Sequence, residues 1–367
     1  MIPPMQQQTA LGEALAGWLA GWNYLGYLTG LLLITRLRDL VLKDRLYRLG
    51  LLLAVLTTLM MGLGEAPWLW GLSRYLAGLS SAAGLMLGSG LILHWLLRHG
   101  YRSELGLHFS GLGLGIVLGA LLVELTLGWL DWRTQWLVLG LVGALLLLPA
   151  WLGLPRPPAA ALNAAGTSDD ASTPGTEPRR AWLWLLQGAY LCAGFGYVIN
   201  ATFTAVITEQ QPGLAGQGVW MWLLVGIAAA PAPLLWDRIA RRLGYLPTLQ
   251  TAWGLQIVGI LLPVWSSSLA AAIASALLFG ATFIGIVSLV LTMVGVRYPA
   301  HPASIMARLT IGFGLAQIIA PVLAGELAER TGHFDSALLA VAALMLIGLG
   351  CLLTMQRLER RTGRRRP

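Results

Sequence analysis

Two charged residues inside long apolar runs are the first candidates for chemistry in this chain. Arg74 lies roughly seven residues inside the apolar run 68–97, about 10 Å deep at about 1.5 Å per helical residue. An unpaired charge at that depth in a membrane costs about 2.5–3.5 kcal/mol or more, so Arg74 should face a partner or water. Glu124 reaches a similar depth in the run 105–128. We predict an Arg74–Glu124 ion pair in a substrate or coupling site; the alternative is that Arg74 extends outward or caps backbone carbonyls.

Polar and aromatic side chains also recur at helical spacing, which places them on one face of a helix. These stripes contain Arg74 with Ser81 and, in the run 182–208, Tyr190, Tyr197 and Thr204 with Asn200 beside them. Flat aromatic faces with polar groups suit the recognition of a small molecule in a cavity. Polar contacts between packed helices are an equally good interpretation.

Histidine and cysteine residues do not form a metal or disulfide site in the sequence. His94, His99 and His108 are 5 and 9 residues apart, which does not place them together on a helix face, and no carboxylate joins them. Cys192 and Cys351 fall in separate apolar runs. We therefore expect no metal, no cofactor and no catalytic residue, and we do not expect an enzyme.

Membrane helices must position the candidate residues. Hydrophobic residues make up 57% of the chain and charged residues 11%, with a mean hydropathy of +0.71. So few charges could not cover the surface of a water-soluble domain, whereas apolar runs of about 20 residues each cross a hydrocarbon core of about 30 Å. The sequence predicts an all-α polytopic membrane protein with eleven helices, five before a polar gap and six after it, near 13–35, 47–64, 68–97, 105–128, 134–154, 182–208, 216–236, 246–265, 268–296, 304–328 and 335–356.

The basic residues predict the topology. Of the 24 Lys and Arg residues, only Arg133 and Arg330 fall opposite to the others, with Arg74 inside a helix. By the positive-inside rule the shared side is cytoplasmic, so the C-terminus is inside and Met1 is outside. The net charge of +8 therefore reflects topology, and no nucleic-acid partner is expected.

A polar segment at 154–181 separates the two groups of helices. It is rich in Pro, Ala, Ser, Thr and Gly and has no apolar periodicity, which is typical of a flexible cytoplasmic linker. We predict an N-terminal bundle at 1–153, a C-terminal bundle at 182–356 and a basic cytoplasmic tail at 357–367. An even split of six and six helices would need one more helix before Met1.

Several motifs resemble those of the major facilitator superfamily, over nearly the whole chain. The most specific is an arginine followed by small residues, from Arg74 through Gly78 and Ser81 to Gly84. The loop motif of that family is partly matched by Asp237-Arg238-Ile-Ala-Arg241-Arg242-Leu-Gly244, with departures at Pro233 and Ala240. Further segments resemble the YbfB/YjiJ branch of the family, namely Asn23 to Tyr27, Gly194 to Phe203, and His301 to Pro321.

The resemblance implies a fold and a function. It implies two bundles of six helices that alternate access to a central site, hence a secondary active transporter of a small molecule, with a proton gradient as a plausible driver. In such relatives a segment similar to Met1 to Gln6 ends a first helix, which implies either that the sequence starts within the protein or that this helix is missing. The resemblance further implies a bacterial inner membrane, with the lipid bilayer and an unknown small molecule as partners, and we expect a monomer.

The resemblance also bears on the residues. It places the two helices that carry Arg74 and Tyr197 beside the central cavity. It implies a cytoplasmic gate formed by Asp237, Arg238, Arg241 and Arg242, for which anchoring by the positive-inside rule alone is the alternative. The rival function is a non-transporting membrane receptor, sensor or embedded enzyme. That rival should show clustered His, Asp or Glu, or a soluble output domain, and neither is found in the sequence.

Overall fold

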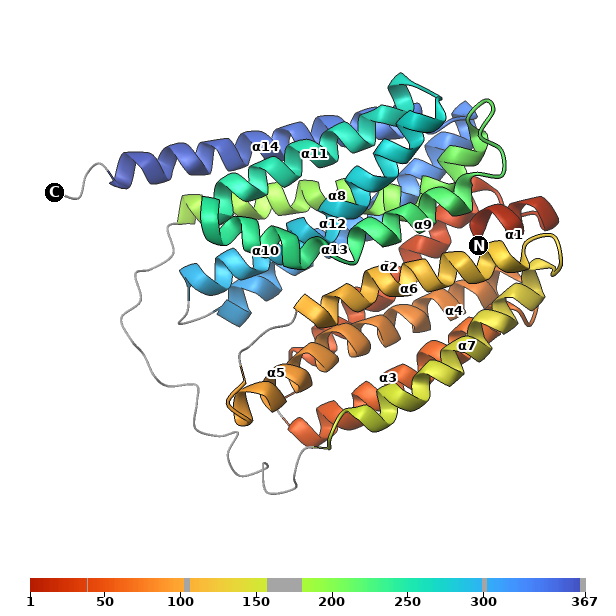
Figure 1. The fold of residues 1–367 in the computed structure, drawn as a ribbon, viewed down its shortest axis with the longest axis horizontal. Coiled ribbons are helices and arrows are strands. Elements are labelled where there is room, and N and C mark those ends of the chain that lie inside the picture. Colours follow the sequence, from red (N-terminus) through yellow and green to blue (C-terminus); the bar gives the residue numbers. More distant parts are fainter. Residues whose placement is uncertain (38, 102–105, 157–179, 299–301, 364–367) are drawn as a thin grey trace. The chain divides into compact units, whose positions relative to one another are not determined.

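The computed structural model describes residues 1–37, 39–101, 106–156, 180–298 and 302–363. Every regular element in this part of the chain is a helix, as predicted (Figure 1). Contacts divide the chain into two units, the first holding Met1–His108 and Leu122–Ala171 and the second Phe109–Leu121 and Ser172–Pro367. The predicted linker lies outside the described residues from 157 to 179, and the bundle boundaries proposed from the sequence stay a prediction.

Unit 1 consists of long helices joined by short loops. Its elements are α1 (Ile2–Gln8), α2 (Glu13–Ile34), α3 (Leu40–Met61), α4 (Pro67–Ala82), the π-helical turn η1 (Ala83–Leu87), α5 (Gly88–Arg98), the two ends of α6 (Gly106–Thr126) and α7 (Trp132–Gly153). Helix α4 packs against α2 and α3, and α3 also packs against α7. The candidate residues Arg74, Ser81 and Glu124 belong to this unit.

Unit 2 is built around α8, which packs against α13 and α14. Its elements are α8 (Arg180–Gln210), α9 (Gly218–Ala229), α10 (Ala232–Leu243), α11 (Tyr245–Trp265), α12 (Leu269–Arg297), α13 (Pro302–Thr331) and α14 (Asp335–Gly363). Helix α14 continues to Gly363, so the first residues of the predicted tail at 357–367 are helical. The middle of α6 packs closely against α9 and so belongs to this unit. The close approach is possible because Gly113 and Gly226 lack side chains: a Cβ on Gly226 would lie 2.8 Å from Val117 N.

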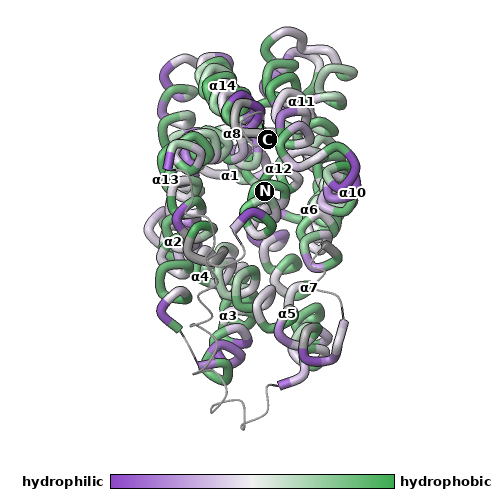
Figure 2. The backbone as a smooth tube through the Cα atoms, turned by 90° about the vertical axis from the view of Figure 1, so that its left-hand side faces the viewer, coloured by the Kyte–Doolittle hydropathy of each residue, from purple (hydrophilic) through white to green (hydrophobic). Residues whose placement is uncertain are grey.

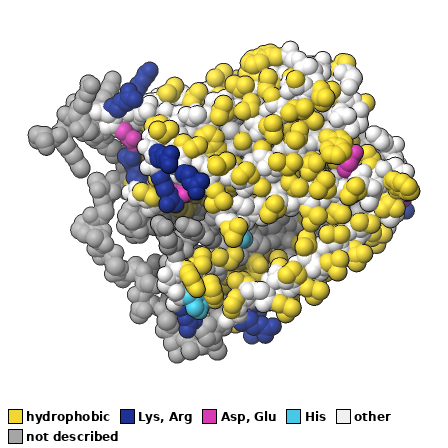
Figure 3. All heavy atoms as spheres, viewed as in Figure 1, with side chains coloured by type: hydrophobic (Ala, Val, Ile, Leu, Met, Phe, Trp, Pro, Cys, Tyr) yellow, Lys and Arg dark blue, Asp and Glu magenta, His cyan; other side chains and the backbone are white. Residues whose placement is uncertain are grey.

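The hydropathy of the helices is that of a multi-pass membrane protein. Among the described residues, eight helices are long and apolar enough to cross a membrane, and α9 with α10 gives a ninth if the bent pair is one span. Hydrophobic residues follow the helices and hydrophilic ones gather at loops and helix ends (Figure 2). Hydrophobic side chains are also spread over the described part of the face seen in Figure 3. Neither α2 nor α3 is among the eight, so the count of eleven stays a prediction.

The start of α3 corrects the sequence prediction. A helix was expected at 47–64, whereas α3 spans Leu40–Met61. Asp39 caps its first turn, accepting a hydrogen bond from Val41 N at 2.8 Å. The charges at the beginning of the helix, interpreted as loop residues, are compatible with it because Asp44 and Arg48 pair at i,i+4 spacing.

Two of the expected spans are interrupted. The run 68–97 contains η1 between α4 and α5, a wide turn of the kind found often at functional sites. The run 216–236 bends by 42° between Ala229 and Ala232, and its second part, α10, continues to Leu243. Pro231 and Pro233 account for this break, since proline lacks the N–H that a continuing helix needs.

Candidate functional site

Arg74 has an aromatic partner. It lies two turns into α4, which begins at Pro67, and its backbone carbonyl accepts a hydrogen bond from Asn23 Nδ2 at 3.1 Å. Its guanidinium carbon lies 5.2 Å from the ring centroid of Trp136 on α7, a cation–π distance. The indole N–H of Trp136 donates to Met5 Sδ on α1 at 3.3 Å. Three helices of unit 1 therefore fix the position of this charge.

The predicted Arg74–Glu124 ion pair is not formed in this structure, as none of the ion pairs recorded between described residues joins the two. Nε of Arg74 and Oε2 of Glu124 are instead both buried and without a hydrogen-bond partner among the described residues. The amide nitrogen and oxygen of Gln135, a residue 1% exposed, are likewise buried without a hydrogen-bond partner among the described residues. Buried polar atoms are rarely left unpaired, so each of these atoms is a candidate for contact with a ligand or for another functional role.

The loops place these groups at one end of unit 1. Glu124 is in the last turn of α6, and the loop 127–131 leads directly to Gln135 in the first turn of α7. Glu65, just before α4, pairs with Arg133 at 2.7 Å, which ties the α3–α4 loop to the same turn. Asp131 caps α7, and hydrogen bonds from Thr134 hold the pKa of Asp131 below its ordinary value.

Ser81 lies on α4 as predicted, but its hydroxyl is used locally. It donates to Ala77 O at 2.9 Å on its own helix, and the residue is exposed. The neighbouring Ser80 is buried and donates to Gly50 O on α3 at 2.9 Å, so the packing contact belongs to Ser80. Sequence spacing distinguishes helix faces, but it did not identify Ser80 as the serine that joins α4 to α3.

The tyrosines predicted on α8 lie together on one face. Tyr190 stacks on Phe313 of α13 with ring centroids 4.6 Å apart, and Tyr197 lies 5.9 Å from the same ring. Tyr197 also stacks on Phe283 of α12 at 5.4 Å. The phenylalanines were not singled out in the sequence, where no spacing relates residues of different helices.

Asn200 and Thr204 follow one turn apart on the same helix. The Thr204 hydroxyl donates to the Asn200 carbonyl at 2.6 Å, and Thr208 donates in turn to the Thr204 carbonyl at 2.9 Å. The Asn200 side chain is different: it is 5% exposed, and its Nδ2 has no partner in the described part of the chain. Of these two candidates, Asn200 is therefore the one with a free donor.

The predicted gate residues lie on α10. Asp237 pairs with Arg241 at 2.6 Å within the helix, and both side chains are substantially exposed, 33% and 56%. Arg238 and Arg242 are exposed as well. The pair is thus formed inside one helix, and the gate itself stays a prediction.

A buried ion pair on α3 was missed in the sequence. Arg48 reaches Asp44 through two parallel bonds, Nε to Oδ2 at 3.0 Å and Nη2 to Oδ1 at 3.1 Å, and both side chains are 7% exposed. The same guanidinium donates to the carbonyls of Trp151 and Leu154 at the end of α7. An aspartate four residues before an arginine was the available signal, and it was interpreted as loop charge.

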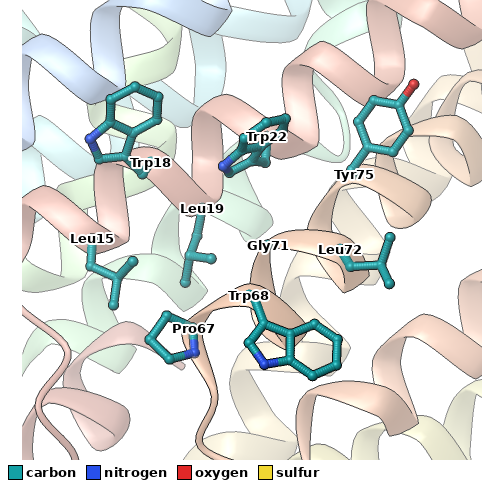
Figure 4. A pocket seen from close by; sticks show the side chains of 9 residues that line it. All are labelled: Leu15, Trp18, Leu19, Trp22, Pro67, Trp68, Gly71, Leu72 and Tyr75. Atoms are coloured by element: carbon teal, nitrogen blue, oxygen red, sulfur yellow. The ribbon is translucent and has the colours of Figure 1, made fainter.

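Each unit also contains an open cavity. In unit 1, α2 and α4 enclose a volume of about 390 Å³ lined by Trp18, Trp22, Trp68 and Tyr75 among apolar residues (Figure 4). In unit 2, a more polar cavity of about 580 Å³ lies where α8 and α11 end, and includes Gln211, His333 and Asp335. Neither cavity contains a residue predicted for the site.

Comparison with known proteins identifies the family. The family described as "Uncharacterised MFS-type transporter YbfB" matches residues 1–354. The chain belongs to this family of the major facilitator superfamily. No protein among the curated sequences matches it. The resemblance found in the sequence is thereby confirmed, and the family together with the apolar helices makes the chain a multi-pass membrane protein of a transporter family.

Solved transporters share the fold of this member of the superfamily. A single-residue variant of the nucleoside transporter NupG is 15% identical, with a TM-score of 0.76 over 96% of this chain and 93% of that chain. NupG itself is 14% identical, with a TM-score of 0.71 over 96% and 92%. The human organic anion transporter MFSD10 (TETRAN) is 18% identical, with a TM-score of 0.61 over 93% and 83%. At these identities the likeness concerns the fold alone.

Proposed function

We propose that this chain is a secondary active transporter that moves a small molecule across a bacterial inner membrane by alternating access, driven by a proton gradient. Its family and its fold support transport. The distribution of basic residues supports a cytoplasmic C-terminus. Asp237, Arg238, Arg241 and Arg242 would then lie at the cytoplasmic side as gate residues, and the transporter would work as a monomer.

One observation supports roles for particular residues: unpaired buried polar atoms lie at one end of unit 1. Arg74 presents a permanent positive charge with an aromatic partner, and its Nε is unpaired. Glu124 presents a carboxylate oxygen without a partner. Ionisable groups retained inside membrane helices at such a cost are commonly functional. Arg74 would bind or orient the substrate, and Glu124 would carry the coupled proton.

Flux into proteoliposomes tests this proposal. The probes are uracil, nicotinamide, benzoate, glucose and tetraphenylphosphonium, each with and without an imposed pH gradient. Arg74→Ala is expected to reduce the rate about tenfold or more, since a charge-assisted hydrogen bond contributes about 1.5–3 kcal/mol. Glu124→Gln, which cannot release a proton, is expected to abolish the dependence on the gradient while exchange of the probe persists.

Arg133→Ala is the matched control, because Arg133 is an exposed arginine at the same end of unit 1, paired with Glu65. Its rate should equal that of the unaltered protein. Full, gradient-dependent flux in both the Arg74 and the Glu124 variants would refute the assigned roles. Absence of probe-dependent flux in every format would refute transport of these classes of molecule by this chain.

A further inference from the structure

Five aromatic rings of unit 2 form a continuous stack, which we call the ring stack: Tyr190, Phe313, Tyr197, Phe283 and Phe279. Successive centroids are 4.6, 5.9, 5.4 and 5.0 Å apart, and successive planes differ by 24°, 24°, 25° and 16°. Aromatic pairs in proteins often meet edge to face. Here every consecutive pair is close to parallel, so ring faces rather than edges are directed along the stack.

Three helices hold the stack in place. Gly194 of α8 allows Phe313 to lie between the two tyrosines, since a Cβ there would lie 2.7 Å from Phe313 O and 2.8 Å from Ala316 Cβ. Phe279 and Phe283 are one turn apart on α12 and are buried in a core cluster of that unit. Tyr190 and Phe279, at the two ends, are each 1% exposed. Tyr197, in the middle, lies between Phe313 and Phe283 and is only partly buried, so the edge of this ring is accessible.

Asn200 adds a hydrogen-bond donor next to this accessible ring. It is one turn beyond Tyr197 on α8, about 4.5 Å further along the axis. Its side chain is 5% exposed, and within the described residues Nδ2 has no partner. If Asn200 served only to join helices, its amide would be bonded to a neighbouring helix. An unpaired NH2 group in this position instead suits a carbonyl oxygen supplied by a ligand.

The segments that supply the ring stack carry no charge. The segments 187–204, 270–296 and 309–325, which supply all five rings, contain no Lys, Arg, His, Asp or Glu. A charged ligand placed here would lose its hydration without gaining a counter-charge from these segments, which is costly in an apolar environment. An uncharged ligand pays no such penalty.

We propose that the Tyr197–Asn200 segment of α8 binds a planar, uncharged heterocycle that carries a ring carbonyl. The face of the heterocycle would pack against the exposed edge of Tyr197, and its carbonyl oxygen would accept a hydrogen bond from Asn200 Nδ2. This substrate class rests on the proposed transport function and adds the chemistry of what is carried. Uracil is the simplest probe with these properties.

Binding to the purified full-length chain in detergent tests the substrate class separately from flux. Uracil is compared with benzoate, which is planar but anionic, and with glucose, which is uncharged but not planar. We expect saturable binding of uracil and none of the other two. Asn200→Leu, which removes the donor, and Tyr197→Leu, which removes the ring, should each raise the Kd for uracil about tenfold or more. Tyr197→Phe, which keeps the ring, should bind as tightly as the unaltered chain.

Phe203→Leu is the control for an indirect effect through folding. Phe203 lies on the same helix, fully buried against Phe334 with centroids 4.7 Å apart, and outside the ring stack. This variant should lose thermal stability while its Kd for uracil stays unchanged. A Kd raised equally by Phe203→Leu and Asn200→Leu would overturn the proposed contact.

The outcomes also distinguish the two proposals. Flux or binding of benzoate or glucose, without flux or binding of uracil, would overturn the substrate class and leave the transport proposal standing. Transport of tetraphenylphosphonium, with no binding of uracil, benzoate or glucose, would have the same consequence. Binding of uracil that is insensitive to Asn200→Leu and Tyr197→Leu would overturn the site. Binding that depends on Asn200, without flux in proteoliposomes, would uphold the site and contradict the transport function.

Discussion

Replacing Asp44 by Ala is expected to lower the free energy of unfolding by about 3–5 kcal/mol, because it leaves the buried guanidinium of Arg48 without its counter-charge. The remaining hydrogen bonds of Arg48 go to the backbone carbonyls of Trp151 and Leu154, which carry no full charge. The end of α7 should loosen from α3 as a result. Thermal unfolding of the purified protein in detergent would report the loss.

The chain supplies a matched control for this effect. Asp237 and Arg241 also form an Asp–Arg pair four residues apart, but their side chains are 33% and 56% exposed against 7% for both members of the α3 pair. Asp237→Ala should therefore cost no more than about 0.5 kcal/mol. The double variant Asp44→Ala with Arg48→Met should recover part of the stability, since it removes the unpaired charge. Equal shifts in the two single variants would contradict the assigned role of burial.

Gly78→Ala is expected to prevent correct packing of unit 1. The crossing of α2 and α4 is so close that a Cβ at Gly78 would overlap the Asn23 carbonyl and lie 2.6 Å from Tyr27 N. Gly26 on α2 meets the Tyr75 carbonyl in the same way. These neighbours are backbone atoms, which cannot turn aside as a side chain can. The two helices would have to separate, with loss of the Asn23–Arg74 hydrogen bond.

The expected result for Gly78→Ala is a low yield of monodisperse protein, with a lowered unfolding temperature in what remains. Gly90→Ala is the control, because a Cβ there has no heavy atom within 4 Å. Alanine is favoured over glycine in a helix interior by about 1 kcal/mol, so this variant should be as stable as the parent or slightly more so. If both alanine variants behave alike, the close approach of α2 and α4 is not what constrains Gly78.

Hydropathy predicted the helices well, because an apolar run inside a membrane must satisfy its backbone hydrogen bonds internally, and a helix does so within one segment. It failed at the start of α3, where charged residues were assigned to a loop. Charge excludes a residue from an apolar environment only when it is unpaired, and Asp44 and Arg48 neutralise each other within one helical turn. Their pairing depends on the backbone carbonyls of α7, which no local pattern indicates.

The candidate site was predictable within single helices and not between them. The shared face of Tyr190 and Tyr197 follows from their seven-residue spacing, and both rings contact Phe313. The partner of Arg74 was wrongly expected to be Glu124, because opposite charge and a similar depth in the membrane were the criteria that the sequence offered. A tryptophan ring also attracts an arginine through a cation–π contact, and which residue lies opposite depends on how α4 and α7 pack.

The π-helical turn η1 affects how this chain can be compared with others. A wide turn holds about one residue more than an α-helical turn, so an ungapped comparison with a regular helix shifts every position after Leu87 by one residue, about 100° around the helix axis. The residue spacing that places two side chains on the same helix face within α4 therefore does not hold between a residue before η1 and one after it. An alignment with a relative whose helix is regular must include a one-residue gap here, and without it every correspondence from Gly88 onward points to the wrong side of the helix.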